Sequence, residues 1–508
     1  MGLSGARAWW GAVTLLVLCG PAFGRQLRET QAGDPIAARA GEGAAALQAG
    51  RFDEAATIYD ELTSARPNDA GLLMNLGMAR YMAGHPADAL APLQKSVRLD
   101  PSLIPASLFL GASLLDLGRS SEAAAPLQRA VTAMPQNADA REMLARAYLA
   151  TSQFTKAVAH YRTLTTLQPD NPKGWYGLAR SYEGIAEAAL TALQQQAPES
   201  PLLELVVADV AVTQEKFPAA LAIYRRVLDA RPPVGGLHEA VAELYERAGK
   251  PDWAAQELRS VKRRPASECA APIAECEFLA GKFRESLAAA MQSPAAAGRY
   301  WTIRAANRLA TEAVAQLETL RPSVELHLIR AELAQSSGRN TESVTEVRAA
   351  LKLSPGNPAI ESALAEALLR AHDLDEALPL LERLNRERLP DTPLLSMYGD
   401  ALLESQQIDR AIPVLERAAA AKDASISTRA SLGRAYVQAG RYEEALPHLN
   451  AAAGEDENGD THYQLARAFQ ALGRPAEAQK AMAEYQKRRQ RTTTLSSGTA
   501  ERTLTPPK

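Results

Sequence analysis

Apolar residues recur at spacings of three and four along almost the whole chain. Leu76, Leu90, Leu93 and Val97 illustrate this spacing within one short stretch. Such spacing places the apolar side chains on one face of an α-helix. No segment alternates between apolar and polar residues with the period of two that a half-buried β-strand shows. The pattern therefore predicts an all-α fold built from many short helices.

The helical pattern itself repeats at a fixed interval. Small residues and prolines recur 34 residues apart, as in the pairs Gly77 and Gly111, Ala89 and Ala123, Pro101 and Pro135. Small residues at repeat positions 8 and 20 allow two antiparallel helices to approach closely. Glycine at position 15, such as Gly84, ends the first helix in a left-handed conformation, and proline near position 32 ends the second. The pattern predicts about 14 helix pairs between residues 36 and 490.

This repeat resembles the tetratricopeptide-repeat (TPR) family. One repeat carries Trp175, Leu178, Ala179 and Tyr182 at family positions, and another carries Leu432, Gly433, Tyr436, Gly440, Ala445 and Pro447. The resemblance covers about nine tenths of the chain. It implies a right-handed superhelical solenoid of antiparallel helix pairs, whose concave face is lined by the first helix of each pair. Glu215, His372 and Gln406 depart from the pattern by replacing the turn glycine, and residues 264–322 match it poorly.

Two repeats, 174–198 and 298–322, are short because the residues between their helices are missing. In the first, the stripe from Leu178 to Leu193 is unbroken, which predicts one helix about 30–35 Å long. A decayed repeat without a role is the alternative. The expected segments are a signal peptide (1–24), N-terminal repeats (36–173), the short repeat predicted as one helix (174–200), middle repeats (201–297), the second short repeat (298–323), C-terminal repeats (324–490) and a disordered tail (491–508).

The N-terminus has the pattern of a secretory signal peptide. Arg7 precedes an apolar stretch from Ala8 to Cys19, and Ala22-Phe23-Gly24 is a small-x-small cleavage site. The apolar stretch is shorter than the roughly 20 residues of a membrane-spanning helix. Lipidation at Cys19 is not favoured, because the residues before it are large. The sequence thus predicts export to a periplasmic or extracellular location, with cleavage near Gly24.

Cleavage would leave two cysteines, Cys269 and Cys276. Seven residues apart on one helix, they would be separated by about 10 Å in rise, beyond the roughly 4.4–6.8 Å that a disulfide spans. The favoured interpretation is two small buried thiols. A local disulfide is the alternative if Cys269 lies off the helix.

Composition and motifs exclude several function classes. The 508 residues are 46% hydrophobic and 23% charged with a net charge of -3, so the chain lacks the basic surface typical of nucleic-acid binding. The seven histidines are scattered, without metal-ligand spacing, and most are expected to face solvent or the groove. No glycine-rich phosphate loop follows a strand. We therefore predict no catalytic, cofactor or metal site, and no small-molecule substrate is implied.

The resemblance implies that positions 2, 5, 9, 12 and 13 of the first helices face the concave side. The residues there form a candidate peptide-binding groove: Met74, Met78, Tyr81, Met82, Arg146, Tyr176, Arg180, Arg434, Tyr463 and Arg467. Guanidinium groups would hold an acidic or C-terminal peptide while its apolar residues pack on methionine and tyrosine. The alternative is structural, with methionine and tyrosine in the core and arginine solubilising the surface.

Three functional hypotheses remain. The favoured one is a non-enzymatic exported TPR scaffold that binds protein partners or extended peptides in the cell envelope. The second is a structural assembly subunit of an envelope or secretion complex, which uses its outer surface rather than the groove. The third, a substrate guide for a hydrolase or transferase, requires a catalytic domain from a separate polypeptide. The sequence does not indicate the oligomeric state.

Overall fold

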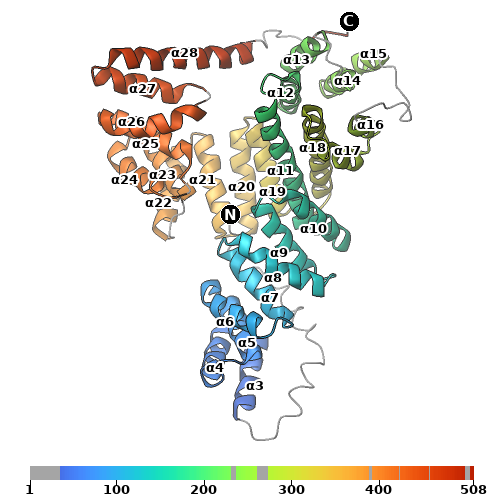
Figure 1. Cartoon of the computed structure of the whole chain (residues 1–508), viewed down its shortest axis with the longest axis vertical. Coiled ribbons are helices and arrows are strands. Elements are labelled where there is room, and N and C mark those ends of the chain that lie inside the picture. Colours follow the sequence, from blue (N-terminus) through green and yellow to red (C-terminus); the bar gives the residue numbers. More distant parts are fainter. Residues whose placement is uncertain are drawn as a thin grey trace. The chain divides into compact units, whose positions relative to one another are not determined.

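The computed structural model of the chain describes residues 35–229, 236–259, 273–387, 392–422, 424–456, 458–497 and 504–507. These residues form 26 α-helices and the short 3-10 helix η2 (Ala453–Glu455), and they contain no strand (Figure 1). The signal-peptide prediction falls on residues 1–24, which lie outside the described residues. Among the described helices, none is both long and apolar enough to cross a membrane.

Four consecutive helix pairs form the part that we call the N-terminal array. The pairs are α3 (Pro35–Gln48) with α4 (Phe52–Ala65), α5 (Ala70–Met82) with α6 (Pro86–Leu99), α7 (Ile104–Asp116) with α8 (Ser120–Ala133), and α9 (Ala138–Ala150) with α10 (Phe154–Leu167). Each helix contacts the next one along the chain, and the first helices α5, α7 and α9 also contact one another in order. The first helices therefore make a continuous face.

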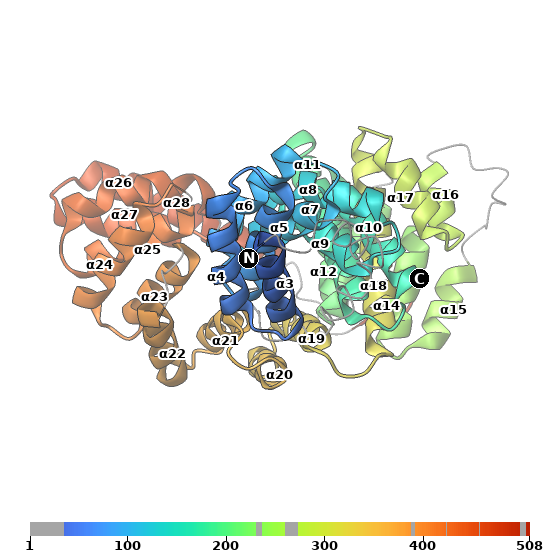
Figure 2. The same ribbon diagram turned by 90° about the horizontal axis from the view of Figure 1, so that it is seen from below.

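Three further pairs form the C-terminal array, whose helices pack one after another in the same way (Figure 2). They are α23 (Thr392–Glu404) with α24 (Ile408–Ala419), α25 (Ile426–Gln438) with α26 (Tyr442–Ala452), and α27 (Asp460–Ala471) with α28 (Pro475–Ser497). The first helices α23, α25 and α27 again contact one another in order. The predicted all-α fold of tandem helix pairs is confirmed.

The two short repeats each contain one helix. α11 (Pro172–Gln196) has 25 residues and α18 (Ala296–Glu318) has 23. The unbroken stripe of the first short repeat thus corresponds to one continuous helix. The chain divides into two compact units, residues 1–191, 302–326 and 356–359 in one and the remainder in the other, and both long helices contain a boundary between them. The segment boundaries inferred from the sequence stay a prediction.

The remaining helices lie between the two arrays in the sequence. They are α12 (Pro201–Thr213), α13 (Phe217–Asp229), α14 (Leu237–Arg247), α15 (Pro251–Arg259), α16 (Ile273–Leu279), α17 (Phe283–Met291), α19 (Val324–Ser336), α20 (Asn340–Leu353), α21 (Pro358–Arg370) and α22 (Leu374–Glu387). α13 packs between α12 and α14, and α14 packs on α15.

Close packing within each pair depends on the small residue at position 8. A Cβ atom added to Gly77 would lie 2.3 Å from Leu93 Cγ, and one added to Gly111 would lie 2.4 Å from Leu127 Cγ. Gly433 has the same relation to Leu449, at 2.6 Å. The alanines at position 20, such as Ala89 and Ala123, are fully buried. The predicted role of small residues in helix approach is therefore confirmed.

The turn after each first helix is left-handed even where glycine is absent. Gly84 has φ 86°, as expected for a glycine at this turn. Glu215, His372 and Gln406 keep positive φ values of 59°, 56° and 60°. Ser152 does the same at 56°. The fold therefore imposes this conformation, which is unfavourable for residues with a Cβ.

Prolines mark not only the ends of the second helices but also their interiors. They lie inside five of them: Pro92, Pro126, Pro379, Pro413 and Pro447. A proline leaves the carbonyl four residues earlier without its helical partner. Arg80 donates to the carbonyl of Asp88, four residues before Pro92, at 3.2 Å. A side chain of the first helix thus replaces the missing hydrogen bond.

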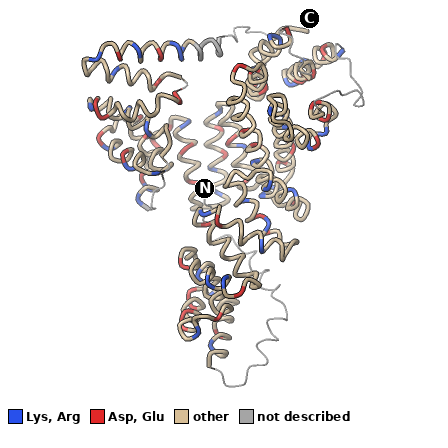
Figure 3. Tube along the Cα trace, in the orientation of Figure 1, with Lys and Arg blue, Asp and Glu red and all other residues tan. Residues whose placement is uncertain are grey.

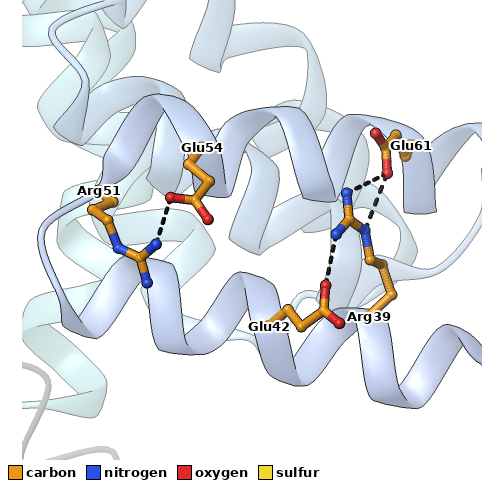
Figure 4. A network of polar contacts seen from close by, with 5 residues as sticks. All are labelled: Arg39, Glu42, Arg51, Glu54 and Glu61. Carbon is orange, nitrogen blue, oxygen red and sulfur yellow. Dashed lines mark hydrogen bonds and ion pairs between the residues drawn. The ribbon is translucent and has the colours of Figure 1, made fainter.

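One ion pair joins the first two helices at their exposed surface, and two others link residues three positions apart in the chain (Figure 4). Arg39 of α3 lies 2.6 Å from Glu42 and 2.8 Å from Glu61 of α4, and Arg51 lies 2.7 Å from Glu54. Exposed pairs of this kind contribute little to stability, because solvent and salt screen their attraction. The buried Ile58 and Tyr59 beneath them therefore account for more of the packing between α3 and α4.

Two predictions about the cysteines and the tail need correction. Cys276 is disulfide-bonded, so the preferred interpretation of two free thiols is wrong for this residue. The spacing argument assumed one helix through both cysteines, whereas α16 begins only at Ile273 and Cys269 lies outside the described residues. The predicted disorder from residue 491 is also wrong in part, because α28 continues to Ser497 and residues 504–507 contact α13 and α14.

Candidate functional site

The first-helix face of the N-terminal array carries most of the predicted groove residues. We define this face by α5, α7, α9 and the beginning of α11. Met74 is a core residue with 3% exposure, whereas Met78, Tyr81 and Met82 are half-buried. Tyr81 packs against Phe109 of α7, with ring centroids 5.7 Å apart. Only the last three of these four residues are therefore accessible to a partner.

Tyr81 and Asp116 interact across the boundary between two repeats. The Asp116 carboxylate at the end of α7 lies near enough to the Tyr81 hydroxyl for each group to shift the pKa of the other. Burial and the neighbouring carboxylate raise the pKa of Tyr81 above its ordinary value. Burial also raises the pKa of Asp116, although Tyr81 and Arg146 favour its ionised form. Both groups are thus positioned as a fixed polar pair.

Arg146 supplies the positive charge of this cluster. Its Nε lies 3.6 Å from Glu142 Oε1, and its side chain is 24% exposed. Burial lowers the pKa of the Arg146 guanidinium, but Glu142, Tyr161 and Asp116 together raise it above its ordinary value. The arginine therefore stays charged and is held by the carboxylates around it.

Two tyrosines, one on α10 and one on α11, complete this group of residues. Tyr161 of α10 is buried, and its pKa is raised well above its ordinary value by burial and by Glu142. Tyr176 of α11 is near enough to raise that pKa further. A Cβ atom on Gly177 would lie 2.1 Å from the Tyr161 ring, so α11 packs tightly on α10. Tyr81, Asp116, Glu142, Arg146, Tyr161 and Tyr176 form what we call the polar cluster.

Arg180 and Arg434 are paired with carboxylates in the same manner. Arg180 lies 2.7 Å from Glu183, whose pKa is raised by burial in spite of this arginine. Arg434 of α25 lies 3.5 Å from Asp400 of α23. Figure 3 shows basic and acidic residues interspersed along the helices. A carboxylate on a partner would therefore have to compete for these arginines with acidic residues of the chain itself.

Tyr463 and Arg467 lie apart from this pattern. Tyr463 is 39% exposed and stacks obliquely on Tyr485 of α28, with centroids 5.4 Å apart. Arg467 is exposed and makes a long contact of 3.4 Å with Gln464. The residues predicted as one groove are therefore divided between two arrays. Whether any of them binds a partner stays a prediction.

The acidic members of the polar cluster were not predicted. Asp116 occupies repeat position 13 and Glu142 occupies position 5, both among the positions that the family places on the concave side. The prediction selected methionine, tyrosine and arginine and left out carboxylates at equivalent positions. Taking every residue at those positions would have identified Asp116, Glu142 and Asp400.

No metal centre emerges from the part of the chain that the structure describes, where no group of three or more His, Cys, Asp or Glu could hold an ion. Most histidines were expected to face solvent or the groove, and His462 is an exception. This residue is 9% exposed, and its Nδ1 lies 2.6 Å from Asp456 Oδ2. It orders the beginning of α27.

Comparison with family models gives the same repeats. Two tetratricopeptide-repeat models match, one at residues 41–104 and 205–268 and the other at 114–181, 334–399, 402–464 and 437–495. The chain belongs to the tetratricopeptide-repeat family. Proteins of this TPR family are generally scaffolds for interaction with other proteins. No curated protein matches the chain.

Solved structures resemble parts of this TPR chain. "Crystal structure of MamA protein" is 27% identical, with 30% of this chain and 84% of that chain covered and a TM-score of 0.28. "MamA 41-end from Desulfovibrio magneticus RS-1" is 26% identical, with 29% and 84% covered and a TM-score of 0.28. "MamA MSR-1 C2" is 21% identical, with 33% and 98% covered and a TM-score of 0.29.

Proposed function

We propose that this TPR protein is a non-enzymatic scaffold, exported to the cell envelope, that binds an extended segment of a partner protein on the first-helix face of the N-terminal array. The polar cluster carries this proposal. Its six side chains come from the helices α5, α7, α9, α10 and α11, and the half-buried Met78 and Met82 lie on the same α5. A preformed surface of this kind lowers the entropic cost of ordering a partner.

Because the arginines are already paired with carboxylates of the chain, the charge of the expected partner segment can be specified. Arg146 is surrounded by Glu142 and Asp116, so the cluster has more acidic than basic groups. A partner with a basic side chain and main-chain N–H donors would complement these carboxylates. Its apolar side chains would pack on the adaptable methionines. We therefore favour a basic, partly apolar segment over an acidic one.

Site-specific photo-crosslinking in the native cell tests this face against the outer surface. One variant carries a photoreactive residue at Met82 on α5, and a matched one carries it at the exposed Arg98 on α6. Binding on the first-helix face should give a partner adduct from position 82 and not from 98. The reverse result would favour the structural assembly subunit of an envelope or secretion complex. Adducts at neither position would contradict the scaffold proposal.

Export is tested independently by the N-terminus of the chain purified from its native cells. The proposal expects the mature chain to begin at Arg25, directly after the cleavage site at Gly24. Recovery of the chain from the cytoplasm with Met1 in place would contradict export. The crosslinking experiment would then still test, independently of export, whether a partner binds on the first-helix face.

A further inference from the structure

In three repeats, the tyrosine at position 11 forms a side-chain hydrogen bond with the residue at position 25 of the preceding repeat. Tyr148 donates to Gln128 at 3.2 Å, and Tyr436 donates to Glu416 at 2.7 Å. In the third case, Tyr245 of α14 meets Arg225 of α13. The separation in sequence is 20 residues each time. The contact is therefore a regular feature of the repeats.

Arginine at position 25 reverses the direction of this hydrogen bond. Gln128 and Glu416 accept the tyrosine proton, whereas Arg225 has only donors and gives its own proton to the Tyr245 hydroxyl at 3.1 Å. The Tyr245 hydroxyl proton is then available for another acceptor. Tyr245 is fully buried when the tail is in place, so within this arrangement its proton needs an acceptor from the protein.

The tail of the chain supplies the acceptor. Tyr245 donates to the main-chain carbonyl of Thr505 at 2.7 Å. Arg225 donates to the same carbonyl at 3.3 Å, to the Thr505 hydroxyl and to the carbonyl of Pro506 at 2.6 Å. Two side chains from consecutive helices thus hold two successive carbonyls of the tail.

The chemistry of the tail matches the chemistry of this site. Arg225 and Tyr245 offer donors, and Pro506 and Pro507 have carbonyl acceptors but no N–H donors. Proline also restricts the segment to an extended conformation, which reduces the entropy lost on binding. A segment with ordinary residues in their place would bring main-chain N–H groups, for which the Arg225 guanidinium has no acceptor.

We propose that Arg225 and Tyr245 form a binding site for an extended, proline-containing main chain, and that the segment Leu504–Pro507 of the same molecule is its occupant. The tail then competes with any outside segment of the same chemistry. This site lies on helices other than those of the polar cluster and does not depend on the scaffold proposal.

Fluorescence anisotropy with a labelled peptide of residues 501–508 tests the site directly. A chain that ends at Ser497 has the site vacated and retains all of α28. This chain should bind the peptide, and the full chain should bind it at least about tenfold more weakly, because a tethered tail has an effective concentration near the millimolar range. A scrambled peptide should not bind. Failure of the shortened chain to bind would overturn the proposal.

Two substitutions in the shortened chain assign the binding to Arg225. Arg225→Gln reproduces the arrangement of Gln128 with Tyr148, so the variant has a precedent within the fold and should keep its helical content. It should weaken peptide binding by about tenfold or more, because glutamine is shorter, has fewer donors than the guanidinium and can accept the Tyr245 proton through its amide oxygen. Arg226→Gln is the matched control, since Arg226 points to Glu204 at 2.8 Å and should change binding less than about twofold. Equal binding by both variants would overturn the assignment.

Sedimentation of the full chain distinguishes its own tail from the tail of a second copy. A monomer over the micromolar range, together with weak peptide binding, is the expected result. A dimer that disappears when the chain ends at Ser497 would show that the occupant comes from a second copy. That outcome would overturn the intramolecular assignment while retaining the site.

Discussion

The two arrays place an aspartate beside an arginine of the following repeat, with different surroundings. In the N-terminal array, Asp116 of α7 interacts with Arg146 of α9 and with Tyr81. In the C-terminal array, Asp400 of α23 lies 3.5 Å from Arg434 of α25, and both Arg434 and Ser431 favour the ionised form of this carboxylate. Burial raises the pKa of both aspartates. The two pairs thus share a charge pattern and differ in how many neighbours hold it.

The difference shows that equivalent arginines of the repeat can have different polar surroundings. Arg146 has Glu142, Tyr161, Asp116 and Tyr81 around it. Arg434 has one carboxylate, its Nε has no hydrogen-bond partner in the structure, and its side chain is 37% exposed. An arginine at the same family position, 9, therefore belongs to an enclosed polar cluster in one array and to a simple, partly exposed ion pair in the other.

The largest expected effect is the loss of Arg146. Arg146→Ala would leave the carboxylates of Glu142 and Asp116 without their partly buried cation, which should cost about 3 kcal/mol. Arg434→Ala should cost less than about 1 kcal/mol, because that pair is half-exposed. Urea unfolding with hydrogen exchange read separately over α7–α9 and α23–α25 would measure both, since each repeat contacts mainly its neighbours. Equal costs would remove the distinction between the arrays.

The next effect should be the same in both arrays. Gly111→Ala and Gly433→Ala each drive a Cβ into the facing leucine, at 2.4 and 2.6 Å, and overpacking of this kind costs about 2 kcal/mol. Gly41→Ala on α3 is the control, because a Cβ there meets nothing within 4 Å and should be neutral or slightly stabilising. The midpoint of urea unfolding compares the three variants. A loss at Gly41 equal to the other two would contradict the packing explanation.

Periodic features of this fold could be predicted from the sequence, and features that depend on particular partners could not. Gly77 and Gly111 recur because every pair must pack at that point, so spacing alone identified the helices and their contacts. Asp116 and Glu142 belong to the polar cluster because of their interactions with Arg146. Asp116 lies in the preceding repeat and Glu142 one helical turn before Arg146, and the 34-residue spacing does not reveal either interaction. Arg225 was missed because it lies on a second helix, outside the positions that the family assigns to binding, and its contact with Thr505 spans 280 residues.

A smaller effect is expected at the left-handed turns that follow the first helices. The turn after α5 has a glycine, whereas the turn after α23 has a residue with a Cβ. Gln406 has φ 60° and Gly84 has φ 86°. Gln406→Gly should raise the free energy of unfolding by about 0.5–1 kcal/mol, because glycine accepts this conformation without strain. Gly84→Ala should lower it by about 1 kcal/mol for the same reason. Thermal unfolding of both variants is the check, and a destabilised Gln406→Gly variant would mean that the glutamine side chain contributes more than the strain costs.

The smallest effect is a dependence on pH that both arrays should share. Because the pKa of Asp116 and that of Asp400 are raised in the folded chain, the folded state holds these protons more tightly than the unfolded state does. Their contribution to stability is then present at low pH and is lost as the pH rises from the ordinary aspartate range, about 3.9, through the raised values. The free energy of unfolding of Asp116→Asn, minus that of the unsubstituted chain, should therefore increase with pH, and Asp400→Asn should behave alike. Carboxylates elsewhere cancel in this difference. A slope of opposite sign for Asp116 alone would mean that Tyr81 and Arg146 outweigh its burial, and the two arrays would then differ in charge as well as in packing.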